Sequence, residues 1–165
     1  MGAEDFQITL YSNVSIQEAQ QTLESWPQVR TVPPMYNMPS INCFVYEDDE
    51  HLVEILLDRD RDNGEKGISL DCRFALCHPD SVDECFTRLA IAFANRLHAL
   101  ITIRDEVPES DAYKFDIYEM DQFRDVAKRA ICMKRHFWQT DFGSERARLT
   151  SAGAIKHFIV DRLNQ

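Results

Sequence analysis

The chain has 165 residues, of which 44% are hydrophobic, 10% aromatic and 28% charged. This composition excludes a mainly disordered chain, and a domain of this size buries enough surface to fold without disulfides or a structural metal. The formal net charge of -10 repels phosphate backbones and anionic membranes, so it disfavours general nucleic-acid and lipid binding.

The first predicted elements are a strand and a helix. Residues 6–11 alternate between apolar and polar side chains, which predicts a strand with one buried face. Ser15 and Glu18 have the spacing of a capping box, so a helix is expected to begin there and to end before Pro27. Four of the six prolines lie between positions 27 and 39, which predicts a long loop.

Three further strands are predicted at residues 41–46, 52–58 and 68–77. The acidic residues at 47–50 form the first turn between them, and Asn63 with Gly64 the second. Successive strands joined by turns pair antiparallel, so this part of the chain should form a meander.

A second helix and another strand follow the meander. Ser81 and Glu84 repeat the capping-box spacing, and the apolar residues within 82–97 share one face of a helix that ends near Ala99. Residues 100–103 are apolar and rich in β-branched side chains, which predicts a buried strand.

The order β-α-β-β-β-α-β over residues 5–104 resembles a ferredoxin-like sandwich with one extra strand, so the expected fold class is α+β. Many unrelated functions share this layout, and it implies no activity.

The remaining chain predicts a docked, mostly helical extension over residues 108–165. It contains a possible edge strand at 113–117, a helix with an apolar stripe through 123–137, and a closing helix at 152–163. Each helix has an apolar face that needs covering, so residues 1–165 are expected to form a single domain.

The sequence also predicts the cellular location of the protein and the redox state of its cysteines. The N-terminus lacks the pattern of a secretory signal, and no apolar stretch is long enough to cross a bilayer, so we expect a cytoplasmic protein. The cysteines contain no CxxC pair and should be reduced thiols, most of them small core residues. They stand at positions 43, 72, 77, 85 and 132.

No motif in the chain names a reaction. The sequence has no nucleophile elbow, phosphate loop, dinucleotide fingerprint or zinc-protease motif. Cys77 and His78 are neighbours on a predicted strand end, so their side chains should point to opposite faces of the sheet. An enzyme using this pair and a carboxylate is therefore a third, less favoured class, and we expect no enzyme and no cofactor.

A metal site is not expected either. His51, His98, His136 and His157 lack a metal-site spacing, and their ordinary role is at the surface or in a satisfied hydrogen bond. The segment at 58–64 begins like a calcium loop but departs from it. Asn63 separates the third carboxylate from the glycine, and Ser69 stands where a bidentate glutamate is required.

Basic residues gather in the C-terminal part of the chain. Residues 124–165 carry nine of the 18 basic residues and only four of the 28 acidic ones. The basic side of the helix predicted there suits a nucleic-acid surface, but it also suits a face that balances the acidic excess elsewhere, either within the chain or between subunits. We favour the second interpretation. The residues concerned are Arg124, Lys128, Arg129, Lys134 and Arg135.

Acidic residues should converge at one end of the predicted sheet, because connections in a meander alternate between its two ends. The turn at 47–50, the start of the second helix and the end of the last sandwich strand then share one end. We call this predicted set the acidic edge. It comprises Glu47, Asp48, Asp49, Glu50, Asp80, Asp83, Glu84, Asp105, Glu106, Glu109 and Asp111. Acidic loops and helix starts are ordinary in an acidic protein, but gathered carboxylates also favour a basic partner.

In size, acidity and lack of a catalytic signature, the chain resembles the immunity proteins that bacteria keep beside interbacterial toxins. This resemblance implies an inhibitor that blocks a basic surface or active site of a cognate toxin. Apolar anchors beside the charge are Tyr46, Trp26 and the loop residues Met35, Tyr36 and Met38; they are equally suited to be core lids. The alternative is a regulatory domain that binds a small molecule between sheet and tail, with a possible homodimer through a sheet edge.

Overall fold

The computed structural model describes residues 5–34, 40–60, 67–76, 81–103, 113–115 and 119–143. Along these segments the chain forms ten elements. They are β1 (Asp5–Ser12), α1 (Ile16–Glu24), β2 (Val29–Val32), β3 (Asn42–Glu47), β4 (Leu52–Arg59), β5 (Ile68–Ala75), α2 (Ser81–Leu97), β6 (Leu100–Ile103), β7 (Tyr113–Phe115) and α3 (Met120–Phe142).

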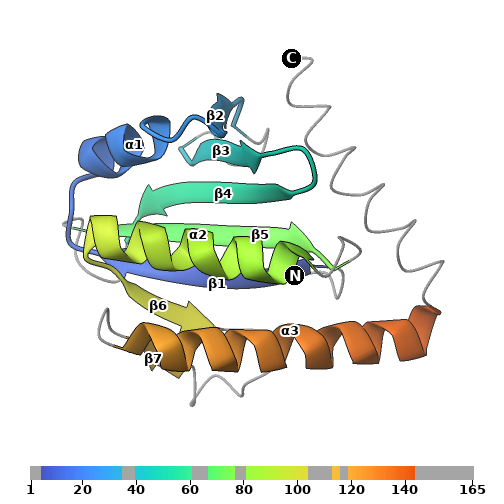
Figure 1. Ribbon diagram of the computed structural model, residues 1–165. Helices are drawn as coiled ribbons and strands as arrows, with labels where there is room; N and C mark the ends of the chain where they lie inside the picture. Colours follow the sequence, from blue (N-terminus) through green and yellow to red (C-terminus); the bar gives the residue numbers. More distant parts are fainter. Residues whose placement is uncertain are drawn as a thin grey trace.

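The strands form one antiparallel sheet in the order β2-β3-β4-β5-β1-β6-β7. β1 lies between β5 and β6, so the strand that precedes α1 is inserted between the strands that flank α2 (Figure 1). This interleaving is the arrangement expected of a ferredoxin-like sandwich. The prediction of an α+β fold is therefore confirmed.

The helices pack on one face of the sheet and bury the main core. Phe6 of β1, Phe74 of β5 and Phe86 of α2 are fully buried, and their ring centroids lie 4.7 to 5.9 Å apart. α3 adds Phe123, which meets Phe115 of β7 at 5.6 Å. Burial of each such ring contributes about 1.5–3 kcal/mol, so this face holds the helices in place.

The opposite face of the sheet carries a smaller apolar cluster and a polar network. Val32, Cys43 and Val45 form the apolar part. Beside them, the side chain of Glu54, only 1% exposed, accepts a hydrogen bond from Arg73, which also lies 3.6 Å from Asp5. Alternation along β3 and β4 thus gives each strand two buried faces of different character.

The predicted loop after Pro27 contains a strand that the sequence pattern missed. β2 pairs with β3 from Val29 opposite Tyr46 to Val32 opposite Cys43. It is an edge strand of four residues, so it needs only one hydrogen-bonded neighbour. Prolines precede and follow β2 but do not interrupt it, and we therefore correct the loop prediction for residues 29–32.

Other boundaries follow the prediction closely. Ser15 caps α1, since its Oγ accepts a hydrogen bond from the backbone N–H of Glu18 at 3.2 Å. α3 ends at Gly143, whose φ of +72° suits a residue without Cβ. The predicted turn at Asn63 and Gly64, the Cys77–His78 pair and the closing helix at 152–163 lie outside the described residues.

Of the described helices, none combines the length and hydropathy needed to cross a bilayer.

Candidate functional site

The acidic edge is built where the β3–β4 turn meets the start of α2. The imidazole Nε2 of His51, in the turn, lies 3.0 Å from Oγ of Ser81, the first residue of α2. Six members of the edge are described there: Glu47, Asp48, Asp49, Glu50, Asp83 and Glu84. The topology thus brings together two acidic segments that are more than thirty positions apart in the sequence.

Asp48 is the centre of the hydrogen bonds within the turn. Its Oδ1 accepts hydrogen bonds from the backbone N–H groups of Glu50 and His51 at 3.0 and 2.7 Å. Its Oδ2 accepts the hydroxyl of Tyr46 at 2.9 Å. The His51 Nδ1 lies 2.9 and 3.0 Å from the two carboxylate oxygens. The turn is therefore fastened by hydrogen bonds from Tyr46 of β3 and from its own residues Glu50 and His51.

These contacts set the ionisation of the two groups involved. Burial opposes the charge on Asp48, but hydrogen bonds from His51, from the backbone and from Tyr46 lower its pKa well below the ordinary value. Burial, the hydrogen bond to Asp48 and the proximity of Cys85 raise the pKa of Tyr46. The carboxylate therefore stays charged and the phenol stays neutral over the physiological range.

The α2 part of the acidic edge is neutralised by α3. Arg135 Nη2 lies 2.8 Å from Asp83 Oδ1, and both side chains are largely covered. Lys128 Nζ lies 3.1 Å from Glu84 Oε2, and its hydrogen bond and charge lower the pKa of Glu84. The interpretation that the basic helix balances the acidic excess internally is confirmed for these two pairs.

The exposed charge is concentrated at the tip of the turn. Glu47 pairs with Arg30 of β2 at 2.6 Å. Asp49 is exposed and makes no ion pair with a described residue. Glu50, with 69% of its side chain exposed, has only a 3.9 Å contact with His51. Within the described part of the acidic edge, Asp49 and Glu50 thus carry the uncompensated charge.

The remaining predicted site residues divide into two groups. Tyr46 is 5% exposed, so it supports the turn rather than presenting a contact surface. Trp26 packs against Phe93 at 5.2 Å and under the guanidinium of Arg96, as a core lid does. The others lie outside the described residues: Tyr36, Asp80, Asp105, Glu106, Glu109, Asp111, Met35 and Met38.

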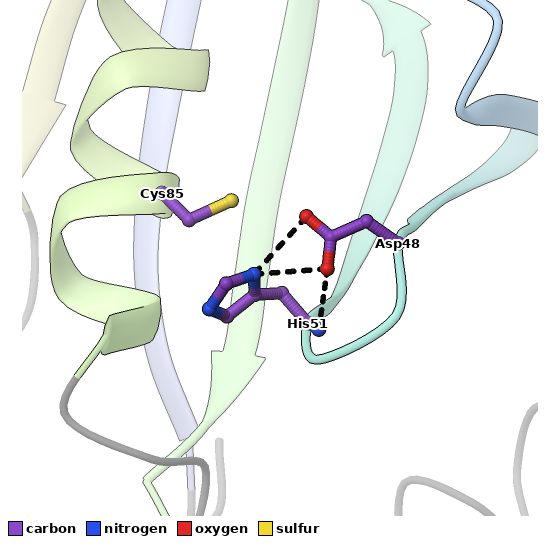
Figure 2. Close-up of side chains that lie close together, drawn as sticks. All are labelled: Asp48, His51 and Cys85. Carbon is purple, nitrogen blue, oxygen red and sulfur yellow. Dashed lines mark hydrogen bonds and ion pairs between the residues drawn. The ribbon is translucent and has the colours of Figure 1, made fainter.

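The sequence interpretation missed a cluster of three donor groups beneath the turn. Figure 2 shows the thiol of Cys85, from α2, pointing toward the paired side chains of Asp48 and His51. One donor atom from each residue lies within 4.8 Å of the other two. Asp48 and His51 are three positions apart in a turn, but the distant Cys85 joins them only once the topology is known.

Hydrogen bonds run from Asp48 through His51 to Ser81 in the order found in Ser–His–Asp hydrolases. A hollow of about 600 Å3 lies at the opposite end of the sheet, around the start of α1. It is lined by Asn13, Val14, Ser15, Ile16, Gln17, Arg59 and Gly67. The Ser81 contact also joins the turn to the start of α2.

Comparisons with known protein families, with curated proteins and with solved structures found no match to this chain.

Proposed function

We propose that this chain is a non-catalytic protein-binding protein of the cytoplasm. It acts as an immunity or inhibitor protein does, by covering a basic surface or active site of a cognate toxin or enzyme. The observation that carries the proposal is the β3–β4 turn, where Asp48 fixes the backbone while Asp49 and Glu50 remain exposed and uncompensated among the described residues.

The rigidity of this turn supports binding. A loop that is already ordered loses little conformational entropy when a partner docks, so more of the contact energy is retained as affinity. The net charge of -10 adds a long-range field that accelerates encounters with a basic surface. The side chains of Asp49 and Glu50 can then form charge-assisted hydrogen bonds with arginine or lysine.

Further contacts remain predictions. Asp80, Asp105 and Glu106 belong to the acidic edge by the same topological argument, and Tyr36 is the proposed aromatic anchor. Asp83 and Glu84 should contribute less to partner binding than the sequence suggested, because Arg135 and Lys128 already pair with them. A partner must either leave these pairs intact or replace them.

The alternative, a domain that binds a small molecule between sheet and tail helices, has weaker support. Phe123, Ala127, Ile131 and Trp138 of α3 are buried in the core on that side. The hollow around the start of α1 is the feature that favours this alternative, at a different place from the one expected. Among the described strands, the edges of the sheet are the short strands β2 and β7, and short edges are poor templates for a homodimer.

The test compares two double charge reversals with equal change in net charge. Asp49→Lys with Glu50→Lys alters the tip of the turn, whereas Glu18→Lys with Asp125→Lys alters exposed carboxylates elsewhere. A tagged wild-type chain is used to capture a partner from cells of its source, and the purified partner is then titrated with each variant. We expect the tip variant to lose at least tenfold in affinity and the control less than about threefold.

Equal affinity of both variants for the partner would place the contact elsewhere and reject this surface. A thermal shift produced by small metabolites, with no protein captured, would instead support the alternative.

A further inference from the structure

We propose that Asp48, His51 and Cys85 bind one transition-metal ion of the zinc type. The three side chains supply oxygen, nitrogen and sulfur donors within 4.8 Å of one another (Figure 2). The property goes beyond partner binding and does not depend on it. It also departs from the sequence interpretation, which expected no metal.

The donor separations suit a tetrahedral ion after small side-chain rotations. Zinc bonds of about 2.0–2.3 Å place neighbouring ligand atoms roughly 3.3–3.6 Å apart. The His51 Nδ1 and the Asp48 oxygens, at 2.9 and 3.0 Å, must separate by a few tenths of an ångström. The Cys85 thiol must approach them by at most about 1.2–1.5 Å, given the 4.8 Å limit on the observed separations.

Neighbouring groups already orient two of the three donors. Ser81 Oγ lies 3.0 Å from His51 Nε2, so it can accept a hydrogen bond from Nε2–H while Nδ1 faces the ion. Tyr46 donates its hydroxyl to Asp48 Oδ2, and two backbone N–H groups hold Oδ1. Outer hydrogen bonds of this kind fix ligand orientation in metal sites and strengthen binding.

The donor set selects the class of ion. A thiol with an imidazole favours Zn²⁺ or Co²⁺ over Mg²⁺ or Ca²⁺, which prefer oxygen ligands alone. Binding displaces the Cys85 thiol proton to solvent and moves the His51 proton from Nδ1 to Nε2. The thiolate and the Asp48 carboxylate then balance the two positive charges of the ion, which makes burial of the site less costly. Water or a partner side chain completes the fourth position.

The experiment uses Co²⁺ as a spectroscopic probe on the full chain after treatment with EDTA. We expect one equivalent of Co²⁺ to give a thiolate-to-cobalt charge-transfer band together with the visible bands of a tetrahedral ion. Addition of one equivalent of Zn²⁺ should remove both. Cys85→Ser should abolish the charge-transfer band, and His51→Gln should weaken Co²⁺ binding at least tenfold.

The matched control is Cys132→Ser, which changes an exposed thiol on α3 and should keep the band. Near-ultraviolet circular dichroism of each metal-free variant shows whether it folds, and His51→Gln tests the site even where Cys85→Ser does not fold. No band in the wild type, a band that survives Cys85→Ser, or wild-type affinity in His51→Gln each overturns the proposal.

Discussion

Asp48 is the residue on which the β3–β4 turn most depends. Replacement by asparagine removes a charged acceptor that serves two backbone N–H groups, Tyr46 and His51. Because hydrogen bonds to a charged group are the stronger kind and this side chain is partly exposed, we expect Asp48→Asn to lower the free energy of unfolding by about 1–2 kcal/mol at neutral pH.

The same substitution should have a pH-dependent effect. The pKa of Asp48 is lower in the folded chain, so its stabilising contribution is complete above the ordinary value of about 4 and is lost as the pH falls further. Urea unfolding in EDTA from about pH 7 to about pH 3 should show the two proteins converging. A constant difference contradicts this account, and Asp49→Asn serves as the control because Asp49 is exposed.

His98, the residue that follows α2, has an unusual backbone conformation. Its φ of +49° is left-handed, a conformation that costs an L-residue about 1–2 kcal/mol. Glycine adopts it freely but loses more entropy on folding, so His98→Gly should raise the free energy of unfolding by about 0.5–1 kcal/mol. Denaturant unfolding checks this, with His98→Ala as control. Equal stability of the glycine and alanine variants would contradict it.

Residue-level chemistry was the hardest part to predict from sequence. The strand and helix patterns predicted that the turn at 47–50 and the start of α2 lie at the same end of the sheet, because period and turn chemistry are local signals. His51 and Cys85 are separated by a strand pair and a helix start, and no local pattern relates them. Their approach depends on the packing of α2 against the turn, which only the three-dimensional structure specifies.

At the scale of elements, α3 is fixed to α2 by two ion pairs of different burial. The Asp83 and Arg135 side chains are 21% and 11% exposed, whereas those of Glu84 and Lys128 are 60% and 49% exposed. A double-mutant cycle with Asp83→Asn and Arg135→Gln should give a coupling energy of about 1–2 kcal/mol. The cycle with Glu84→Gln and Lys128→Gln should give less than about 0.5 kcal/mol because water screens that pair. Equal couplings would show that burial does not govern these contacts.

Helices and strands with a long periodic pattern were predictable from the sequence, whereas the short edge strand β2 was not. β1, β4, β5 and α2 each present a repeating apolar face over at least eight residues. β2 has only four residues, with Val29 and Val32 on opposite faces and exposed residues between them. β2 is stabilised by its hydrogen bonds to β3, which the local sequence does not reveal. The nearby prolines therefore led to the prediction of a loop at these residues.

At the scale of the whole molecule, the distribution of charge explains both stability and the proposed binding. The chain concentrates basic residues after position 123 and acidic residues before it. Arg135 and Lys128 of α3 form ion pairs with Asp83 and Glu84, which relieves repulsion at this part of the acidic edge. No such pairing with a described residue neutralises the tip of the turn. The fold thus separates carboxylates that stabilise the protein from those available to a partner.

The most direct test of this account is the association rate constant between the chain and its captured partner, measured over a series of salt concentrations. We expect the rate constant to fall steeply with salt for the wild type, and much less steeply for Asp49→Lys with Glu50→Lys, while Glu18→Lys with Asp125→Lys keeps a slope close to that of the wild type. A salt dependence that is the same in all three proteins would contradict it.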